Sequence, residues 1–183
     1  MRGPHDGSMS SLDVLRATAH PVRLRLLSLL TATAMSAAEA GRELRVSQAA
    51  ASYHLRVLER AGLIRVVEVV RVRGGDAKRY RHESSAEPFR LDEGVVAGGA
   101  ASEERAEYVE AVIDELRRRS ALRVAGPHLT TDAELWVDPV TWRRVVGAVG
   151  AASALLHEAA RPARTPGTVP VSMTAELFPL RRP

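Results

Sequence analysis

The stretch that decides the fold is Met35–His82, which reads MSAAEAGRELRVSQAAASYHLRVLERAGLIRVVEVVRVRGGDAKRYRH. Its first part predicts a short helix, because Ser36 is suited to cap a helix and Glu39, three residues later, completes a capping box. A tight two-residue turn follows, and Ser47 caps a second helix. Apolar residues recur at helical spacing in that second helix, which predicts that one of its faces packs against the first helix.

A basic hairpin is predicted directly after the second helix. The helix ends at Ala61-Gly62, since glycine tolerates the left-handed conformation found beyond helix ends. Residues 64–73 are β-branched and alternating, Gly74-Gly75-Asp76 is a turn signal, and a run of basic residues leads back. Two helices joined by a tight turn and followed by such a hairpin are typical of a winged helix-turn-helix.

The outer face of the second helix is predicted to read DNA. It carries hydroxyl, amide and guanidinium groups, and two small alanines, Ala49 and Ala50, keep its first turn slim, so the helix is suited to enter the major groove. An ordinary helical hairpin with a solvated face is the alternative. The predicted base-reading residues are Gln48, Ser52, Tyr53 and Arg56, with phosphate contacts from Arg42 and Ser47 and backbone or minor-groove contacts from Arg73, Lys78 and Arg79 of the hairpin.

The residues from about Leu12 to His82 resemble the ArsR-type winged-helix transcription regulators. The resemblance rests on Ser47-Gln48, Ser52, His54-Leu55, Val57-Leu58, Ala61-Gly62-Leu63-Ile64, Arg73-Gly74 and Tyr80-Arg81, and upstream on His20-Pro21-Val22-Arg23. It implies a homodimer that binds a pseudo-palindromic operator in double-stranded DNA, most simply as a repressor. The family often has glycine at the position of Arg45. An arginine there indicates either a left-handed residue strained by about 1 kcal/mol or a different turn geometry.

Composition and charge agree with a DNA-binding protein. Residues 1–90 hold 15 Lys+Arg against 9 Asp+Glu, whereas residues 91–183 hold 11 against 13, so the positive charge lies with the predicted DNA-binding unit. The chain has no cysteine, which excludes disulfides and thiolate sites and agrees with a cytoplasmic protein. It also has no apolar run of eighteen residues, so no membrane segment is predicted.

Five segments are predicted along the 183 residues, in a mainly α fold with a β-wing (α+β). They are a disordered leader or cloning remnant (1–11), the winged helix-turn-helix domain (12–83), a linker (84–101), a dimerisation helix (102–126) and a C-terminal strand-helix-strand lobe (127–183).

The predicted helix after the linker has acidic residues in its first turn and Arg117-Arg118-Arg119 in its last turn, an order that suits the helix dipole. The resemblance assigns this helix to dimerisation, and packing within its own domain is the alternative. Its apolar stripe comprises Tyr108, Val109, Val112, Ile113 and Leu116.

The last third of the chain predicts two strands, at 133–137 and 169–178, around a helix that Asp138 caps with Pro139 in its first position. Two strands alone make a marginal sheet, so we expect them to join another element or a partner subunit. A small-molecule effector, if the regulator has one, is expected here. The residues that would line its apolar pocket, or otherwise form a small core, are Trp136, Trp142, Met173 and Phe178.

Catalysis, cofactors and metal binding are not predicted. The six histidines, at positions 5, 20, 54, 82, 128 and 157, have no paired ligand spacing. No glycine-rich phosphate loop or nucleophile elbow is present in the sequence. Two alternatives to a DNA-binding regulator remain, namely a winged-helix protein that only dimerises or docks on proteins and an enzyme with its site in the C-terminal lobe.

Overall fold

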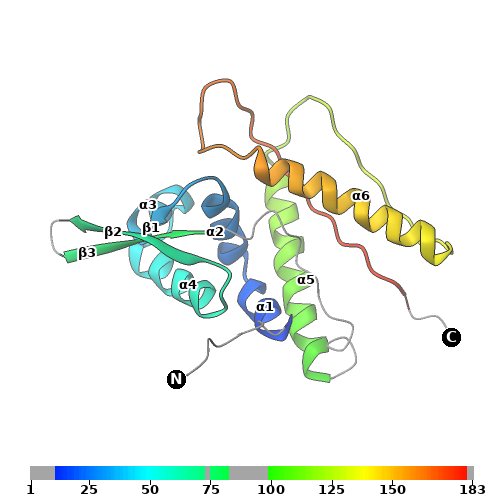
Figure 1. The fold of residues 1–183 in the computed structure, drawn as a ribbon, viewed down its shortest axis with the longest axis horizontal. Coiled ribbons are helices and arrows are strands. Elements are labelled where there is room, and N and C mark those ends of the chain that lie inside the picture. The colour runs from blue at the N-terminus through cyan, green and yellow to red at the C-terminus, as the bar shows by residue number, and fades with distance from the viewer. Residues whose placement is uncertain (1–10, 73–74, 83–98, 181–183) are drawn as a thin grey trace, which may run out of the picture.

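The computed structural model describes residues 11–72, 75–82 and 99–180, and within these ranges it has six helices and one three-stranded sheet. Figure 1 shows the sheet and the short helices on one side, a long helix through the middle and another long helix on the far side. The predicted α+β class is confirmed. The elements are α1 (Ser11–Thr18), α2 (Pro21–Ala32), β1 (Met35–Ser36), α3 (Ala37–Leu44), α4 (Gln48–Arg60), β2 (Arg65–Val72), β3 (Gly75–Arg81), α5 (Gly99–Ser120) and α6 (Pro139–Glu158).

The two helices of the helix-turn-helix, α3 and α4, begin at the predicted caps. The backbone N–H of Ser36 donates to Glu39 Oε2 at 2.7 Å, and the N–H of Glu39 donates back to Ser36 Oγ at 3.3 Å. At the start of α4, Ser47 Oγ accepts from the N–H of Ala50 at 3.1 Å. Each bond satisfies a backbone donor that the first turn of a helix leaves without a partner, so the local sequence sets both starts.

The turn between α3 and α4 is left-handed at Arg45, with φ 56° and ψ 44°. The N–H of Arg45 donates to Arg42 O and that of Val46 to Gly41 O, as in a Schellman end. Of the two turn geometries considered for Arg45, the structure therefore has the left-handed one, whose backbone strain is about 1 kcal/mol. The glycine that the turn requires is Gly41, where a Cβ would lie 3.0 Å from the carbonyl oxygen of Val46.

The core of the winged helix lies between α2 and α4. Leu26 and Leu30 of α2 and Leu55 and Leu58 of α4 have no exposed surface, and Leu63 closes the end of α4 beside them. Burying each such side chain stabilises the fold by about 1.5–3 kcal/mol. The helical spacing of these leucines therefore explains why one face of α4 packs against α2 in the core.

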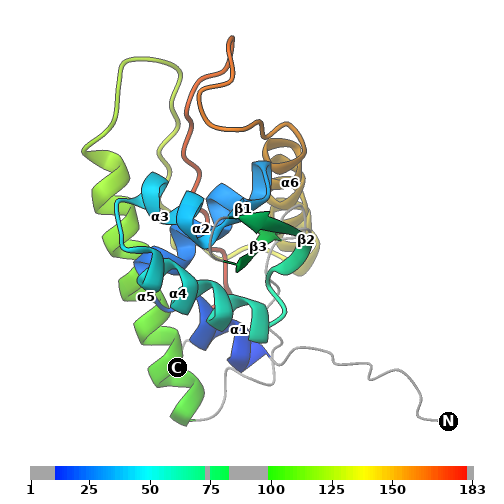
Figure 2. The same ribbon diagram turned by 90° about the vertical axis from the view of Figure 1, so that its left-hand side faces the viewer.

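The predicted hairpin is confirmed as β2 and β3, which pair antiparallel with a bulge between Val66 and Glu68. A short third strand, β1, was not predicted. It pairs with β3 through Met35 and Tyr80, and the sheet order is β1-β3-β2. The wing is thereby joined to the residues that start α3, and Figure 2 shows it beside α3 and α4.

The long helix α5 packs against α1 and α2 of the same chain. It begins at Gly99, three residues before the predicted start, and ends at Ser120 rather than near residue 126. Most of the predicted linker 84–101 lies outside the described residues. The buried face of α5 includes Glu115, 2% exposed, whose carboxylate contacts Arg25 of α2 at 3.1 Å. Charges as well as apolar contacts therefore hold α5 to the domain.

Residues 121–180, here called the C-terminal arm, contain α6 between two extended segments. The start of α6 is confirmed, because Asp138 Oδ1 accepts from the N–H groups of Val140 and Thr141 at 2.9 and 3.0 Å. The two predicted strands, 133–137 and 169–178, are wrong for the single chain, since neither range is a strand. Alternation of side chains makes a segment suited to a sheet, but a strand forms only beside another strand.

Candidate nucleic-acid interface

The outer face of α4 presents the residues predicted to read DNA. Gln48, Tyr53 and Arg56 are exposed, and Ser52 is half-buried between them. The Arg56 Nε donates to the backbone oxygen of Ser52 at 3.2 Å, so its guanidinium lies along its own helix. With the opposite face of α4 buried in the core, this polar face is presented to solvent on a rigid support.

Two arginines flank the start of α4. Arg42, at the end of α3, and Arg45, in the turn, are both exposed, and neither forms a salt bridge within the described part of the chain. The first turn of a helix carries partial positive charge that attracts phosphate. Ser47 caps this turn, so its hydroxyl also lies there. The predicted phosphate-binding residues Arg42 and Ser47 are thus near one helix end, together with Arg45.

The predicted DNA-contacting residues of the wing differ in exposure and in their bonds to the rest of the chain. Lys78 is exposed, and its Nζ lies 3.9 Å from Glu59. Arg79 is half-buried, because its guanidinium donates to Glu39 Oε1 at 3.2 Å and to the backbone oxygen of Ala34 at 2.6 Å. These bonds fasten β3 to the start of α3, so Arg79 has a structural role that the sequence did not indicate. Arg73 lies outside the described residues.

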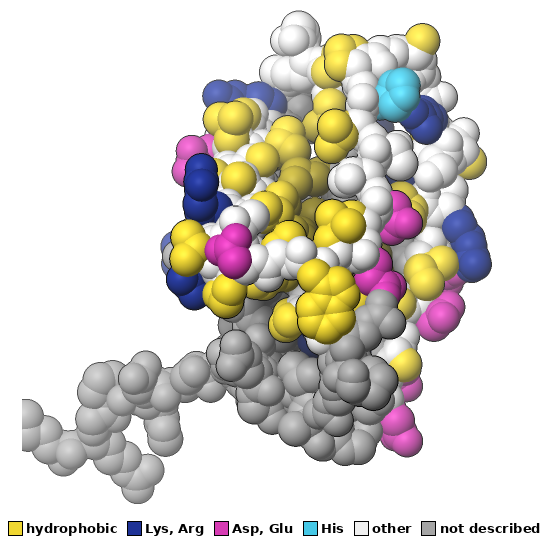
Figure 3. Space-filling model, turned by 90° about the vertical axis from the view of Figure 1, so that its right-hand side faces the viewer, with side chains coloured by type: hydrophobic (Ala, Val, Ile, Leu, Met, Phe, Trp, Pro, Cys, Tyr) yellow, Lys and Arg dark blue, Asp and Glu magenta, His cyan; other side chains and the backbone are white. Residues whose placement is uncertain are grey.

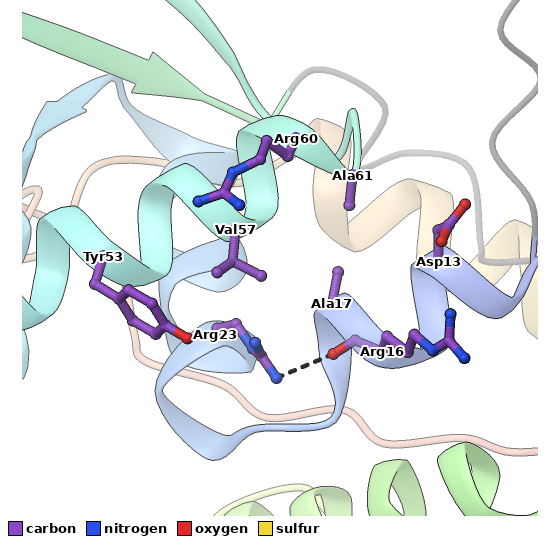
Figure 4. Close-up of a pocket in the computed structure, with 8 residues that line it drawn as sticks. All are labelled: Asp13, Arg16, Ala17, Arg23, Tyr53, Val57, Arg60 and Ala61. Atoms are coloured by element: carbon purple, nitrogen blue, oxygen red, sulfur yellow. Dashed lines mark hydrogen bonds between the residues drawn. The ribbon is translucent and has the colours of Figure 1, made fainter.

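A basic hollow of about 330 Å³ lies beside Tyr53, between α1, α2 and α4 (Figure 4). Arg23 reaches across it, and its Nη2 donates to the backbone oxygen of Arg16 at 3.0 Å. Burial lowers the pKa of Arg23, while the charges of Tyr53 and Glu107 oppose that change. The hollow adds basic surface next to the exposed polar face of α4. Its lining is Asp13, Arg16, Ala17, Arg23, Tyr53, Val57, Arg60 and Ala61.

Arg23 and Arg60 were not predicted as part of the interface. They come from two helices that are separate in the sequence, and the helices meet only through the packing of the domain. An arginine on the solvent side of a helix is common, so no local signal singles out either residue.

The two histidines beside this surface are structural. His20 caps α2, its Nδ1 accepting from the N–H of Val22 at 3.1 Å. The ring of His54 lies 4.5 Å from that of His20. Burial lowers the pKa of both side chains, and neighbouring positive charges lower it further, so both rings are neutral near pH 7. Within the described residues, no three metal-binding side chains come together.

The apolar stripe of α5 is only partly available to a partner. Arg105 of α5 binds Glu176 of the C-terminal arm at 3.4 Å, and burial together with the charge of Glu176 raises the pKa of Tyr108, which is half-buried. Val109, Val112 and Ile113 are half-buried, and Leu116 is 47% exposed. Dimerisation through this stripe stays a prediction.

The four residues proposed for a ligand pocket do not enclose one in the single chain. Trp136 is 86% exposed, Phe178 and Met173 are also exposed, and Trp142 is half-buried. They do not form a small buried core either. A side chain as open as Trp136 contributes neither to a core nor to a closed cavity.

A family profile described as a helix-turn-helix domain matches residues 18–67, which run from the end of α1 into β2. The chain carries a helix-turn-helix domain. This domain supports a DNA-binding regulator, and it contains the whole of the exposed polar face of α4. A sequence search of curated proteins found no match for the chain. None of the described helices combines the length and apolar character needed to cross a membrane.

Proposed function

We propose that this protein is a sequence-specific regulator of transcription of the ArsR type that binds double-stranded DNA as a homodimer and acts as a repressor. The observation that carries the proposal is the exposed polar face of α4, which presents Gln48, Tyr53 and Arg56, while the small residues Ala49 and Ala50 keep the first turn slim. Glutamine and arginine are the side chains best suited to hydrogen-bond adenine and guanine edges in the major groove.

Phosphate contacts would come from the residues around that face. Arg42, Arg45 and Ser47 surround the start of α4, and Lys78 projects from the wing. Contacts to phosphate fix the register of a protein on DNA and make its affinity depend on salt, without reading sequence. Arg23 and Arg60, beside Tyr53, are suited to the same task. Arg79 would have to leave its present acceptors to contact DNA.

The homodimer and the repressor role rest on the resemblance to ArsR-type regulators. Two copies of α4 would address two half-sites of a pseudo-palindrome, about 34 Å or a multiple of it apart. The proposal places the protein in the cytoplasm and gives it no catalytic step, cofactor or metal.

The releasing signal would act through the C-terminal arm. Arg164 of the arm binds the carboxylate of Glu43 with both Nη atoms, each at 3.0 Å, and Glu43 belongs to α3. A ligand that moved the arm would therefore act on the helix next to α4. Trp136 and Trp142 both belong to the arm, so their fluorescence is a direct screen for a small-molecule effector.

The proposal is tested by selecting bound DNA from a random pool and measuring the affinity of the selected duplex by fluorescence anisotropy. We expect Gln48→Ala and Arg56→Ala each to lose about 1–3 kcal/mol of preference for the selected sequence. Lys78→Ala should weaken all duplexes alike and reduce the salt slope by about one phosphate contact.

Arg123→Ala is the matched control for charge, because Arg123 is exposed and belongs to the C-terminal arm, outside the helix-turn-helix domain. It should leave the sequence preference unchanged. If the parent protein selects no sequence, it is not a sequence-specific regulator, and a winged helix that only docks on proteins is the better reading. Normal discrimination by both α4 variants would show that another element reads the bases.

A further inference from the structure

The C-terminal arm leaves an unusual amount of apolar surface in water. Among the described residues, 21 large hydrophobic side chains are exposed, and 16 of them follow Ser120. No residue from 121 to 180 is buried. Figure 3 shows apolar side chains around an open hollow on the side of the molecule where α6 and the C-terminal segment lie. Contiguous apolar surface of this kind marks a protein contact.

The extended segment after α6 also lacks backbone partners. Val169 and Val171 are 76% and 69% exposed and lie on one side of an alternating stretch. Residues 169–180 form no backbone–backbone hydrogen bond with the rest of the described chain. An alternating extended segment with open N–H and C=O groups is a template for another strand. Within the described part of a single chain, the segment thus leaves apolar side chains exposed and backbone groups without hydrogen-bond partners.

The charges on the exposed face of α6 indicate which partner fits. Arg144 near its start and Glu158 at its end lie on that face, with Ala151 midway between them. Neither charged side chain forms a salt bridge within the described residues. The two charges are 14 residues apart, about 21 Å along the helix, and opposite in sign. A helix with this pattern is complementary to itself when it is reversed.

We propose that the C-terminal arm packs against the same arm of a second copy of this chain, with the two α6 helices antiparallel. A two-fold axis at Ala151 places Arg144 of each copy opposite Glu158 of the other. It also places Leu155, which is 69% exposed, opposite Gly147, where a Cβ would meet no atom within 4 Å. A two-fold interface uses the same patch on both subunits, and the arm meets that requirement.

The arm is already positioned on its own chain for this role. Arg105 and Arg119 of α5 bind Glu176 and Thr174 of the last segment at 3.4 Å each. Arg164 is bound to α3 as described above. A contact between two arms would therefore also set the distance between the two copies of α4. The inference deepens the homodimer of the proposed function by locating its interface, and it does not require DNA.

The test measures the association of the full chain without DNA by sedimentation velocity over a range of concentrations. We expect the parent protein to be a dimer, and Val171→Glu to weaken the dimer by about 100-fold or more. Val69→Glu is the matched control, since Val69 is a similarly exposed valine on the wing, 58% against 69%. It should leave the dimer intact. Far-UV circular dichroism of the monomer reports whether each variant is folded.

Charge reversal tests the antiparallel register. Arg144→Glu and Glu158→Arg should each weaken the dimer by about tenfold, because each places two like charges together at symmetry-related positions. The protein with both substitutions should recover most of the parent affinity. Recovery is a result that a merely structural role for either residue would not produce.

Several outcomes would overturn the inference. A parent protein that stays monomeric at every concentration, or a dimer insensitive to Val171→Glu, would remove the arm as the interface. Dissociation by Leu116→Glu alone would assign the dimer to α5 instead. Loss of association in the doubly reversed protein would exclude the antiparallel register. DNA selection is measured separately, so a dimeric protein without sequence preference would overturn the proposed function and leave this inference standing.

Discussion

The winged helix and the C-terminal arm are built from equally apolar sequence but reach opposite outcomes. In residues 11–82 the leucines lie at helical spacing on helices that face one another, and Leu26, Leu30, Leu55 and Leu58 have no exposed surface. In residues 121–180 the apolar residues lie on one helix and two extended segments, and none is buried. Apolar content therefore does not make a core. A core needs a second surface that faces the first, and among the described residues the apolar surface of the winged helix has one whereas that of residues 121–180 does not.

The largest expected difference between the two regions comes from the same substitution made in each. Leu55→Ala removes a fully buried side chain and should reduce the free energy of unfolding by about 2–5 kcal/mol. Leu155→Ala, on the exposed face of α6, should change the stability of the monomer by about 0.5 kcal/mol or less. Urea unfolding followed by circular dichroism, at concentrations where the protein is monomeric, measures both. Equal losses would show that the arm has a core of its own.

Helix α5 connects the winged helix and the arm, and substitution of its buried carboxylate is expected to have the next largest effect on stability. Glu115 contacts Arg25, Arg118 and Arg119 at 3.1, 2.8 and 3.4 Å. Glu115→Gln removes the common counter-charge, and we expect a loss of about 3 kcal/mol in unfolding free energy. Glu110→Gln, an exposed carboxylate on the same helix, is the control and should have little effect. A small effect of Glu115→Gln would mean that apolar contacts alone hold α5 in place.

A pH effect is expected where the arm approaches the winged helix, at His82. Burial, with the charge of His157 as the second cause, lowers the pKa of His82 from 6.5 to about 4. The unfolded chain takes up this proton near pH 6.5 and the folded chain only near pH 4, so stability falls as the pH is lowered between these values. At pH 5 the loss from His82 should be about 2 kcal/mol.

Urea unfolding of the parent and of His82→Gln at pH 7 and pH 5 isolates this contribution. The variant should lose less stability than the parent between the two pH values. The pKa values of the Glu39 and Asp138 carboxyls are lowered, so these groups change the stability in solutions more acidic than pH 5 and do not affect this comparison. The lowered pKa values of His20 and His54 also reduce the stability as the pH falls, but both histidines are present in the parent and in the variant, so their contribution cancels. Parallel pH profiles would show that His82 is accessible to protons in the folded chain.

The smallest effect is expected at the exposed ion pair between the arm and α3. Arg164→Ala should leave the unfolding of the winged helix unchanged, because exposed pairs contribute little. It should increase hydrogen exchange in residues 161–168, which the pair with Glu43 helps to hold. Arg161→Ala is the control, since within the described residues Arg161 bonds to backbone oxygens of its own turn and to no acidic side chain. Unchanged exchange would mean that the arm is positioned by its contacts with α5.

The parts that sequence predicted well are those set by neighbours along the chain. Ser36, Ser47 and Asp138 cap the helices expected of them, because a cap bonds to backbone two or three residues away. The hairpin followed from alternation and a glycine turn, and the polar outer face of α4 followed from a helix with one apolar side. Each of these features is local, so a single stretch of residues contains its cause.

What sequence missed depends on contacts between distant residues. The bonds of Arg79 to Glu39 and Ala34, some forty residues earlier, were not predicted, and its contact with DNA stays a prediction. Glu115 gave no sign that it would be buried, and the hollow beside Tyr53 exists only because three helices converge there. The strands predicted in the arm have the right alternation, but no neighbouring strand pairs with them in the described part of the chain.

The sequence by itself therefore determined a helix-turn-helix with a wing, since caps, turns and helical periodicity act over a few residues. Tertiary structure alone decided which of the described arginines are exposed without a salt bridge, which charge is buried under α5, and that the arm is left without a core. The physical reason is that burial and pairing depend on which surfaces meet, and that is settled only when the whole chain is packed.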